Sequence, residues 1–129
     1  MNEPNTPVEV YKAIIDQLVG ETRLYGSCSH VAKSGKYSNA PAHSEYNKFI
    51  GSLSPQQREL LARMLQEERD GTIHDVLAVL TWWITARGVG FTFHGKPMPV
   101  ELSGMGLQGD YVGRRDGWEW PASEQASEA

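Results

Sequence analysis

The sequence predicts an α+β fold of about four helices, followed by a small antiparallel sheet of β-hairpins packed on the helical layer. Apolar side chains recur at helical spacing up to Gly88, and beyond it they alternate with polar ones at a period of two. The chain has 129 residues, 40% of them hydrophobic, which suffices for one core. We therefore expect residues 1–129 to form a single domain, with disordered tails at 1–6 and 121–129.

The first helix is expected over 7–25. Thr6 and Glu9 have the spacing of a capping box, in which each side chain accepts a hydrogen bond from the other's backbone N–H, and Pro7 suits the first helical position. The apolar and aromatic stripe that follows consists of Tyr11, Ile14, Ile15, Leu18, Val19 and Tyr25.

Residues 26–41 are small, polar and turn-forming, so a long loop is expected there. A short second helix is expected over 42–51. Its apolar positions recur at helical spacing and are Tyr46, Phe49, Ile50 and Leu53.

The third helix begins after Ser54, which has capping-box spacing from Gln57. Asp70-Gly71 predicts a break, so the third and fourth helices are expected to form a tight hairpin. The fourth helix lies near 72–87, and its stretch Val76–Ile84 is apolar nearly all round. Such a helix is predicted to be central and covered on most sides.

Trp82 and Trp83 project about 100° apart on that helix, so they cannot both join one buried stripe. One is expected to pack under the sheet. The other is expected under the 26–41 loop or at a subunit interface, which would make the protein a homo-oligomer such as a homodimer.

Two alternating stretches, 89–93 and 98–102, flank a predicted turn at 94–97, which contains His94. Pro99 cannot donate to a ladder, so the second stretch is expected at an edge. A second hairpin is expected around Asp116-Gly117.

Twelve Lys and Arg against sixteen Asp and Glu give a net charge of −4, which argues against general nucleic-acid binding. The single cysteine excludes an internal disulfide and fits a reducing compartment. The first seven residues lack the pattern of an export signal, and no apolar stretch is long enough to span a membrane. We therefore expect a cytoplasmic protein with no nucleic-acid or membrane partner.

Gly104–Gly109 matches the dinucleotide-binding pattern G-x-G-x-x-G. That chemistry needs a strand before the motif and a helix after it. Gly113 and Asp116-Gly117 follow too closely for a helix, so we predict a turn-rich connection and no cofactor.

The predicted turn near residue 70 is acidic, and oxygen ligands with one imidazole suit Mn, Fe or Zn. Thr72 and Asp75 are explained as a helix cap, and no E-x-x-H pair is present, so a solvated turn is predicted and a metal site is the alternative. The metal-ligand candidates are Glu67, Glu68, Asp70 and His74.

Cys28 with His30 or His43 has the residue types of a thiol nucleophile and its base. No local signature orients the pair, so an incidental free thiol is predicted.

Aromatic and arginine residues interleave near the C-terminal end, and these types are enriched at recognition hot spots. They are predicted to line a ligand or partner surface in a groove between the helical layer and the C-terminal hairpins. The alternative is that they cover the helical core. These residues are Tyr111, Arg114, Arg115, Trp118 and Trp120.

The run Arg58–Gly71, continued by Ile73–Leu77, resembles small stand-alone bacterial proteins of uncharacterised function, which are often carried on mobile or accessory genes. The resemblance covers roughly the C-terminal half. It implies a bacterial cytosolic protein and carries over no catalytic residue.

No complete catalytic set is present, so we expect a non-catalytic recognition protein whose partner is an unidentified protein or small molecule. The alternative function is a small metal-dependent hydrolase that uses the acidic turn at 67–75.

Overall fold

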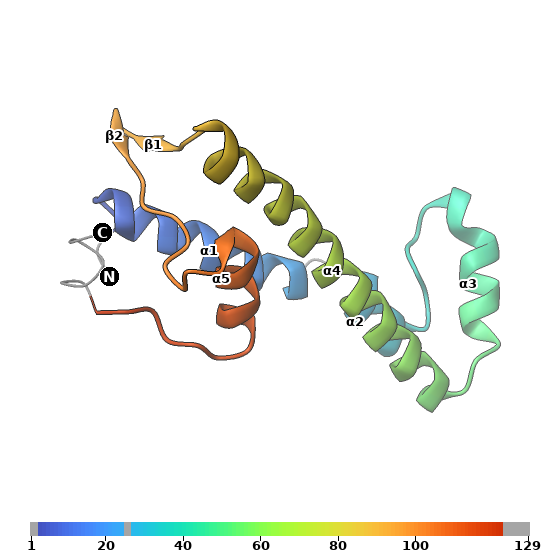
Figure 1. Ribbon diagram of the computed structural model, residues 1–129. Coiled ribbons are helices and arrows are strands. Elements are labelled where there is room, and N and C mark those ends of the chain that lie inside the picture. Colours follow the sequence, from blue (N-terminus) through green and yellow to red (C-terminus); the bar gives the residue numbers. More distant parts are fainter. Residues whose placement is uncertain (1–2, 25–26, 123–129) are drawn as a thin grey trace. The chain divides into compact units, whose positions relative to one another are not determined.

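The structure is a computed structural model that describes residues 3–24 and 27–122 (Figure 1). Within these residues it has five α-helices, one 3-10 turn and one two-stranded antiparallel sheet. The α+β class is confirmed, with five helices in place of four. Residues 123–129 of the predicted C-terminal tail lie outside the described residues.

The chain divides into two compact units. The first unit comprises Met1–Val19 and Thr72–Ala129, and the second unit comprises Gly20–Gly71.

Helix α1, Pro7–Leu24, begins as predicted. The Oγ1 atom of Thr6 accepts the N–H of Glu9, and the Glu9 carboxylate accepts the N–H groups of Asn5 and Thr6. These backbone donors lower the pKa of Glu9 below its ordinary value, because they stabilise the charged carboxylate. Tyr25, the last residue of the predicted stripe, lies outside the described residues.

The predicted loop over 26–41 is wrong, because helix α2, Ser27–Ser34, occupies much of it. Cys28 and Val31 stand three residues apart and are both buried, so a short apolar stripe is present among the small polar residues. The helix ends at Gly35, whose φ of +70° is a conformation that glycine adopts without strain.

The second predicted helix is confirmed as a 3-10 turn, Pro41–His43, and helix α3, Ser44–Gly51. Arg58 binds the C-terminal end of α3. Its Nε and Nη2 atoms donate to the carbonyls of Ile50 and Gly51, both at 3.2 Å. The same guanidinium lies against Gly35, where a Cβ would meet Nη1 at 2.9 Å.

Helix α4, Pro55–Arg87, is a single helix of 33 residues, so the predicted break and helical hairpin at Asp70-Gly71 are wrong. Its N-terminal capping box is confirmed by reciprocal hydrogen bonds between Ser54 and Gln57. Asp70 is buried and accepts a hydrogen bond from Gln66 one turn earlier, so it belongs to the helix and does not end it. Glycine at position 71 costs about 1 kcal/mol of helix stability, which packing on a helix of this length offsets.

The first predicted hairpin is present but shorter than expected. Strand β1, Thr92–Phe93, pairs antiparallel with strand β2, Lys96–Pro97. The turn consists of His94 and Gly95 alone, at φ of 50° and 79°, and two positive φ values match the twist of a two-residue hairpin. The predicted strand over 98–102 is wrong; beyond β2 the N–H of Met98 still pairs with the carbonyl of Phe91.

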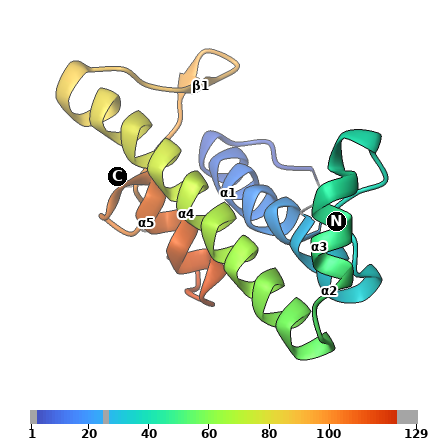
Figure 2. The same ribbon diagram turned by 90° about the vertical axis from the view of Figure 1, so that its right-hand side faces the viewer.

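The predicted second hairpin is wrong, because helix α5, Gly106–Arg115, takes its place. The core of the first unit lies between α1, α4 and α5, and Figures 1 and 2 show α5 beside the other two helices. Its buried cluster consists of Tyr11, Ile15, Leu77, Leu107 and Tyr111.

Candidate functional site

The structure places the predicted aromatic and arginine residues on α5 and the segment that follows it, within the first unit. Tyr111 is fully buried in the core, so it is not a surface residue. Arg115 forms an ion pair with its neighbour Asp116 at 3.0 Å. Helix α5 stands where the second hairpin was predicted, so within residues 3–24 and 27–122 no such hairpin forms one wall of the predicted groove.

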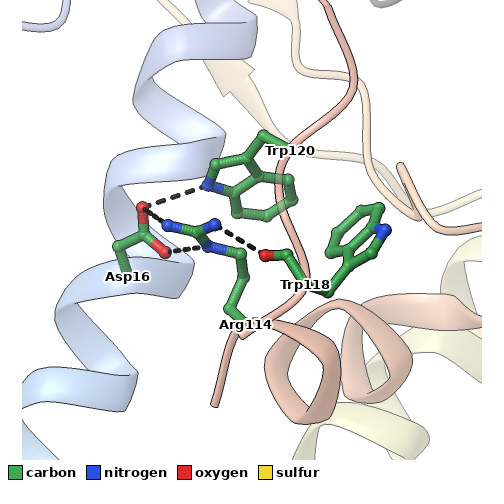
Figure 3. Close-up of polar contacts among 4 residues, drawn as sticks. All are labelled: Asp16, Arg114, Trp118 and Trp120. Atoms are coloured by element: carbon green, nitrogen blue, oxygen red, sulfur yellow. Dashed lines mark hydrogen bonds and ion pairs between the residues drawn. The ribbon is translucent and has the colours of Figure 1, made fainter. Parts of the chain in front are cut away.

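Arg114 and Trp120 converge on Asp16 of α1 (Figure 3). The Nε and Nη2 atoms of Arg114 donate to the two carboxylate oxygens of Asp16 at 2.6 and 3.2 Å, and the indole N–H of Trp120 donates to Oδ2 at 3.0 Å. The guanidinium carbon of Arg114 also lies 5.1 Å from the centroid of the Trp120 ring, a cation–π contact. We call Asp16, Arg114, Trp118 and Trp120 the Asp16 cluster.

Trp118 completes the Asp16 cluster through its backbone and its ring. Its carbonyl accepts a hydrogen bond from the Nη1 atom of Arg114 at 2.7 Å. Its side chain packs on Gly113, where a Cβ would meet the ring at 3.2 Å, and its ring meets that of Trp120 edge to face. The Asp16 cluster therefore fastens the C-terminal segment to α1 and α5.

A cavity of about 380 Å³ borders the Asp16 cluster. Its charged side chains are already engaged within the chain: the Glu9 carboxylate caps α1, and the Nζ atom of Lys12 donates to the carbonyl of Pro121 at 3.4 Å. It is lined by Glu3, Pro4, Glu9, Lys12, Ala13, Asp16 and Trp120.

Asp110, on α5, is the fully buried carboxylate of the first unit. It accepts the N–H groups of Leu102 at 2.8 Å and Ser103 at 2.7 Å, together with the phenol O–H of Tyr11. Burial, followed by the hydrogen bond to the Asp110 carboxylate, raises the pKa of Tyr11 well above its ordinary value. The carboxylate thus holds the segment before α5 against α1.

Thr81 interrupts the apolar run of α4 because it caps another helix. Its hydroxyl oxygen accepts the N–H of Leu107 at 2.9 Å, in the first turn of α5. Gln108, also in that turn, lies within hydrogen-bonding distance of the same hydroxyl at 2.8 Å. The interruption therefore marks the contact between α4 and α5.

The glycines of the dinucleotide-like motif lie at the start of α5, beside this contact between α4 and α5. Gly104 and Gly106 have φ of +77° and +82°, and a Cβ at Gly109 would lie 2.5 Å from that of Met105. The motif does open a helix, so the prediction that no helix follows is wrong. Its glycines are required by the backbone and by close packing within the chain.

The acidic turn proposed as a metal site does not exist, because Glu67, Glu68, Asp70 and His74 follow one another along the continuous helix α4. His74 contacts its acidic neighbour Asp75 at 3.2 Å. Among the residues that the structure describes, no three His, Cys, Asp or Glu side chains are grouped closely enough to hold a metal ion.

Cys28 is buried at 3% exposure and its sulfur contacts the side-chain oxygen of Gln66 at 3.0 Å. His43 instead pairs with the hydroxyl of Ser38 at 2.6 Å, and its ring stacks on Tyr46. His30 is exposed on α2. The structure therefore pairs the thiol with an amide.

The C-terminal half of α4 carries an exposed apolar surface, of which the sequence predicted no more than one tryptophan at a subunit interface. Leu77 is buried, but the expectation that this helix is covered on most sides is wrong, since neither tryptophan is a core residue. The rings of Trp82 and Trp83 meet edge to face, and Arg87 lies over Trp83. We call the exposed side chains the α4 face: Val76 at 52%, Val79 at 58%, Leu80 at 37%, Trp82 at 51% and Trp83 at 43% exposure.

Sequence reasoning missed Asp16, Thr81 and Asp110, each of which binds a segment distant along the chain. Thr81 alone gave a local signal, as a polar residue within an apolar run. None of the helices that the structure describes has a stretch long and apolar enough to cross a membrane.

A family model matches residues 4–122, nearly the whole chain. No curated protein and no solved structure matches it. The match confirms the resemblance to proteins without an assigned activity, and it supplies no site residue. The chain belongs to a family of unknown function, DUF6547.

Proposed function

We propose that this chain is a small non-catalytic recognition protein, and that it acts through contact of the α4 face with another protein chain. The observation that carries the proposal is the exposure of five large apolar side chains within eight consecutive residues of one helix. A contiguous apolar patch on a folded protein typically marks an interaction site.

The packing of the first unit supports this choice of surface. A helix on the outside of a domain normally turns charged and polar side chains to water. The stretch Val76–Ala86 contains no charged residue, although Leu77 alone within it is buried. The core of the unit thus leaves most of the apolar surface of α4 unused.

The Asp16 cluster has the residue types of a recognition surface, but its polar groups form hydrogen bonds within the chain. Both carboxylate oxygens of Asp16 and three guanidinium nitrogens of Arg114 are engaged in hydrogen bonds. A partner that used these groups would first have to break those bonds. The α4 face carries no such cost.

The groups best suited to chemistry are likewise engaged. The Asp110 carboxylate is surrounded by three donors, and the Cys28 sulfur is buried against Gln66. These contacts support a non-catalytic role, because a general base or nucleophile needs access to substrate.

A photoreactive amino acid placed at position 79 tests this function in cells that produce the protein. The matched control is position 64, because Met64 lies on the same helix and its exposure of 57% equals that of Val79 within one per cent. We expect a covalent protein adduct from position 79 and none from position 64. No adduct from position 79, or equal adducts from both positions, would overturn the proposed function.

A further inference from the structure

We infer that the partner of the α4 face is a second copy of this chain, with the two α4 faces packed antiparallel about a two-fold axis. This inference rests on the proposed function and specifies its partner. Three properties of the face support it: the order of its side chains, its area and its charge.

The spacing of the α4 face suits helix-on-helix packing. Val76, Val79, Leu80 and Trp83 stand at i, i+3, i+4 and i+7, which places them along one stripe of α4. In an antiparallel pair centred between Val79 and Leu80, Val76 of one copy lies opposite Trp83 of the other. A small side chain then faces a large one at both ends of the contact, which is how packed layers interdigitate.

The area of the α4 face matches the requirement of a modest dimer. The exposed fractions of its five side chains correspond to roughly 500 Å² on each copy, so a pair that covered all five, with Trp82 at the margin of the stripe, would bury roughly 1,000 Å², the lower limit for a specific interface. An isologous contact uses this patch twice and needs no other surface.

The charges around the α4 face favour a second copy over a membrane surface. The antiparallel register sets Arg87 opposite Thr72, so no two like charges meet at the ends of the contact, and the helix dipoles run in opposite directions. Interfacial membrane helices usually carry several lysines or arginines beside the apolar face. Here the helix from Thr72 onward contains Arg87 as its sole basic residue other than histidine, and the whole chain has a net charge of −4.

Sedimentation of the purified full chain tests the pairing, at concentrations up to roughly 100 µM. We expect a mass twice that of the 14.4-kDa chain. Val79→Glu places a charge at the centre of the contact and is expected to give the single-chain mass, with an unchanged helical circular dichroism spectrum. Met64→Glu introduces the same charge at equal exposure on the same helix and is expected to leave the doubled mass intact.

The orientation is tested by cysteines at the two ends of the face, Thr72→Cys and Arg87→Cys. Both positions are exposed, whereas the native Cys28 is buried. Under mild oxidation, antiparallel pairing predicts a cross-linked dimer when the two variants are mixed, and little when either is oxidised alone. Cross-linking of each variant with itself would overturn the antiparallel arrangement.

Failure of this inference is distinguishable from failure of the proposed function. A wild-type chain that stays at the single-chain mass overturns the second copy, as does a Val79→Glu variant that keeps the doubled mass. If that monomer still yields a position-79 adduct with a different protein, recognition through the α4 face stands with another partner. Binding of the chain to vesicles of anionic lipid, lost in Val79→Glu, would overturn the second copy in favour of a membrane.

Discussion

The first unit contains two pairs of tryptophans that look alike in the sequence and differ in the structure. Trp118 and Trp120 are half-buried, and the indole N–H of Trp120 and the carbonyl of Trp118 are hydrogen-bonded to other parts of the unit. Trp82 and Trp83 are 51% and 43% exposed, their rings meet edge to face, and Arg87 lies over Trp83. Residue types enriched at interfaces thus form hydrogen bonds within the chain at Trp118 and Trp120, and an exposed surface at Trp82 and Trp83.

The difference teaches that aromatic and arginine content alone does not locate a binding surface. What separates the two pairs is whether a partner for the polar groups exists elsewhere in the chain. Asp16 is that partner, and it lies about a hundred residues from Arg114 along the chain, where no local pattern reveals it. Substitutions in the two regions should therefore affect different properties.

The largest effect is expected from Asp110→Ala, which leaves two backbone N–H groups and the Tyr11 hydroxyl without their shared acceptor. Because these donors are wholly or partly buried, we expect a loss of about 3 kcal/mol in the free energy of unfolding. Urea denaturation measures it. A loss below about 1 kcal/mol would show that Asp110 does not hold the segment before α5 in place.

The next effect separates the two tryptophan pairs directly. Trp120→Ala should cost about 2 kcal/mol, since it removes a half-buried ring, its hydrogen bond to Asp16 and its contact with Arg114. Trp82→Ala should cost less than about 1 kcal/mol when measured on dilute protein. Equal losses in the two variants would remove the distinction between fastening and open surface.

A smaller effect is expected from Asp16→Ala, which removes the acceptor of both Arg114 and Trp120. The side chains of Asp16 and Arg114 are 41% and 26% exposed, so water screens the pair, and we expect a loss of about 1 kcal/mol. The mass measured by sedimentation should not change. Dissociation of the dimer in this variant would place the Asp16 cluster in the contact.

An effect of similar size, confined to alkaline pH, is expected from Tyr11. The folded-state pKa of Tyr11 is raised above that of the unfolded chain, so its contribution to stability is complete below about pH 10 and is lost as the pH rises further. We expect the free energy of unfolding to fall by about 1 kcal/mol between pH 10 and pH 11 from this group. Tyr11→Phe should be less stable at pH 7 but should show a shallower alkaline loss, and an equal slope in both proteins would contradict the assignment.

The sequence predicted those elements of the fold that local signals govern. The reciprocal caps at Thr6–Glu9 and Ser54–Gln57 were identified correctly, as was the hairpin turn at His94, because each depends on residues a few positions apart. The predicted helix ends were wrong where a glycine was taken as the end of a helix or as part of a turn. Gly71 lies inside α4, next to the buried Asp70. Gly109 and Gly113 lie inside α5, where an added Cβ would meet the side chains of Met105 and Trp118.

The candidate site was less predictable than the fold. Whether a tryptophan of α4 is covered depends on which elements reach that helix, and helix α5 stands where the second hairpin was predicted. The position of α5 is in turn set by Thr81 and Asp110, whose partners are distant in sequence. Periodicity identified α4 as unusually apolar but not which of its sides stays open.

The most direct test of the central claim is hydroxyl-radical footprinting of all four tryptophans at low and high protein concentration. The α4 face predicts that oxidation of Trp82 and Trp83 is rapid in dilute protein and falls as the concentration rises, whereas oxidation of Trp118 and Trp120 is slower and constant. Concentration-dependent protection of Trp118 and Trp120, with Trp82 and Trp83 unchanged, would contradict it and would make the Asp16 cluster the contact surface.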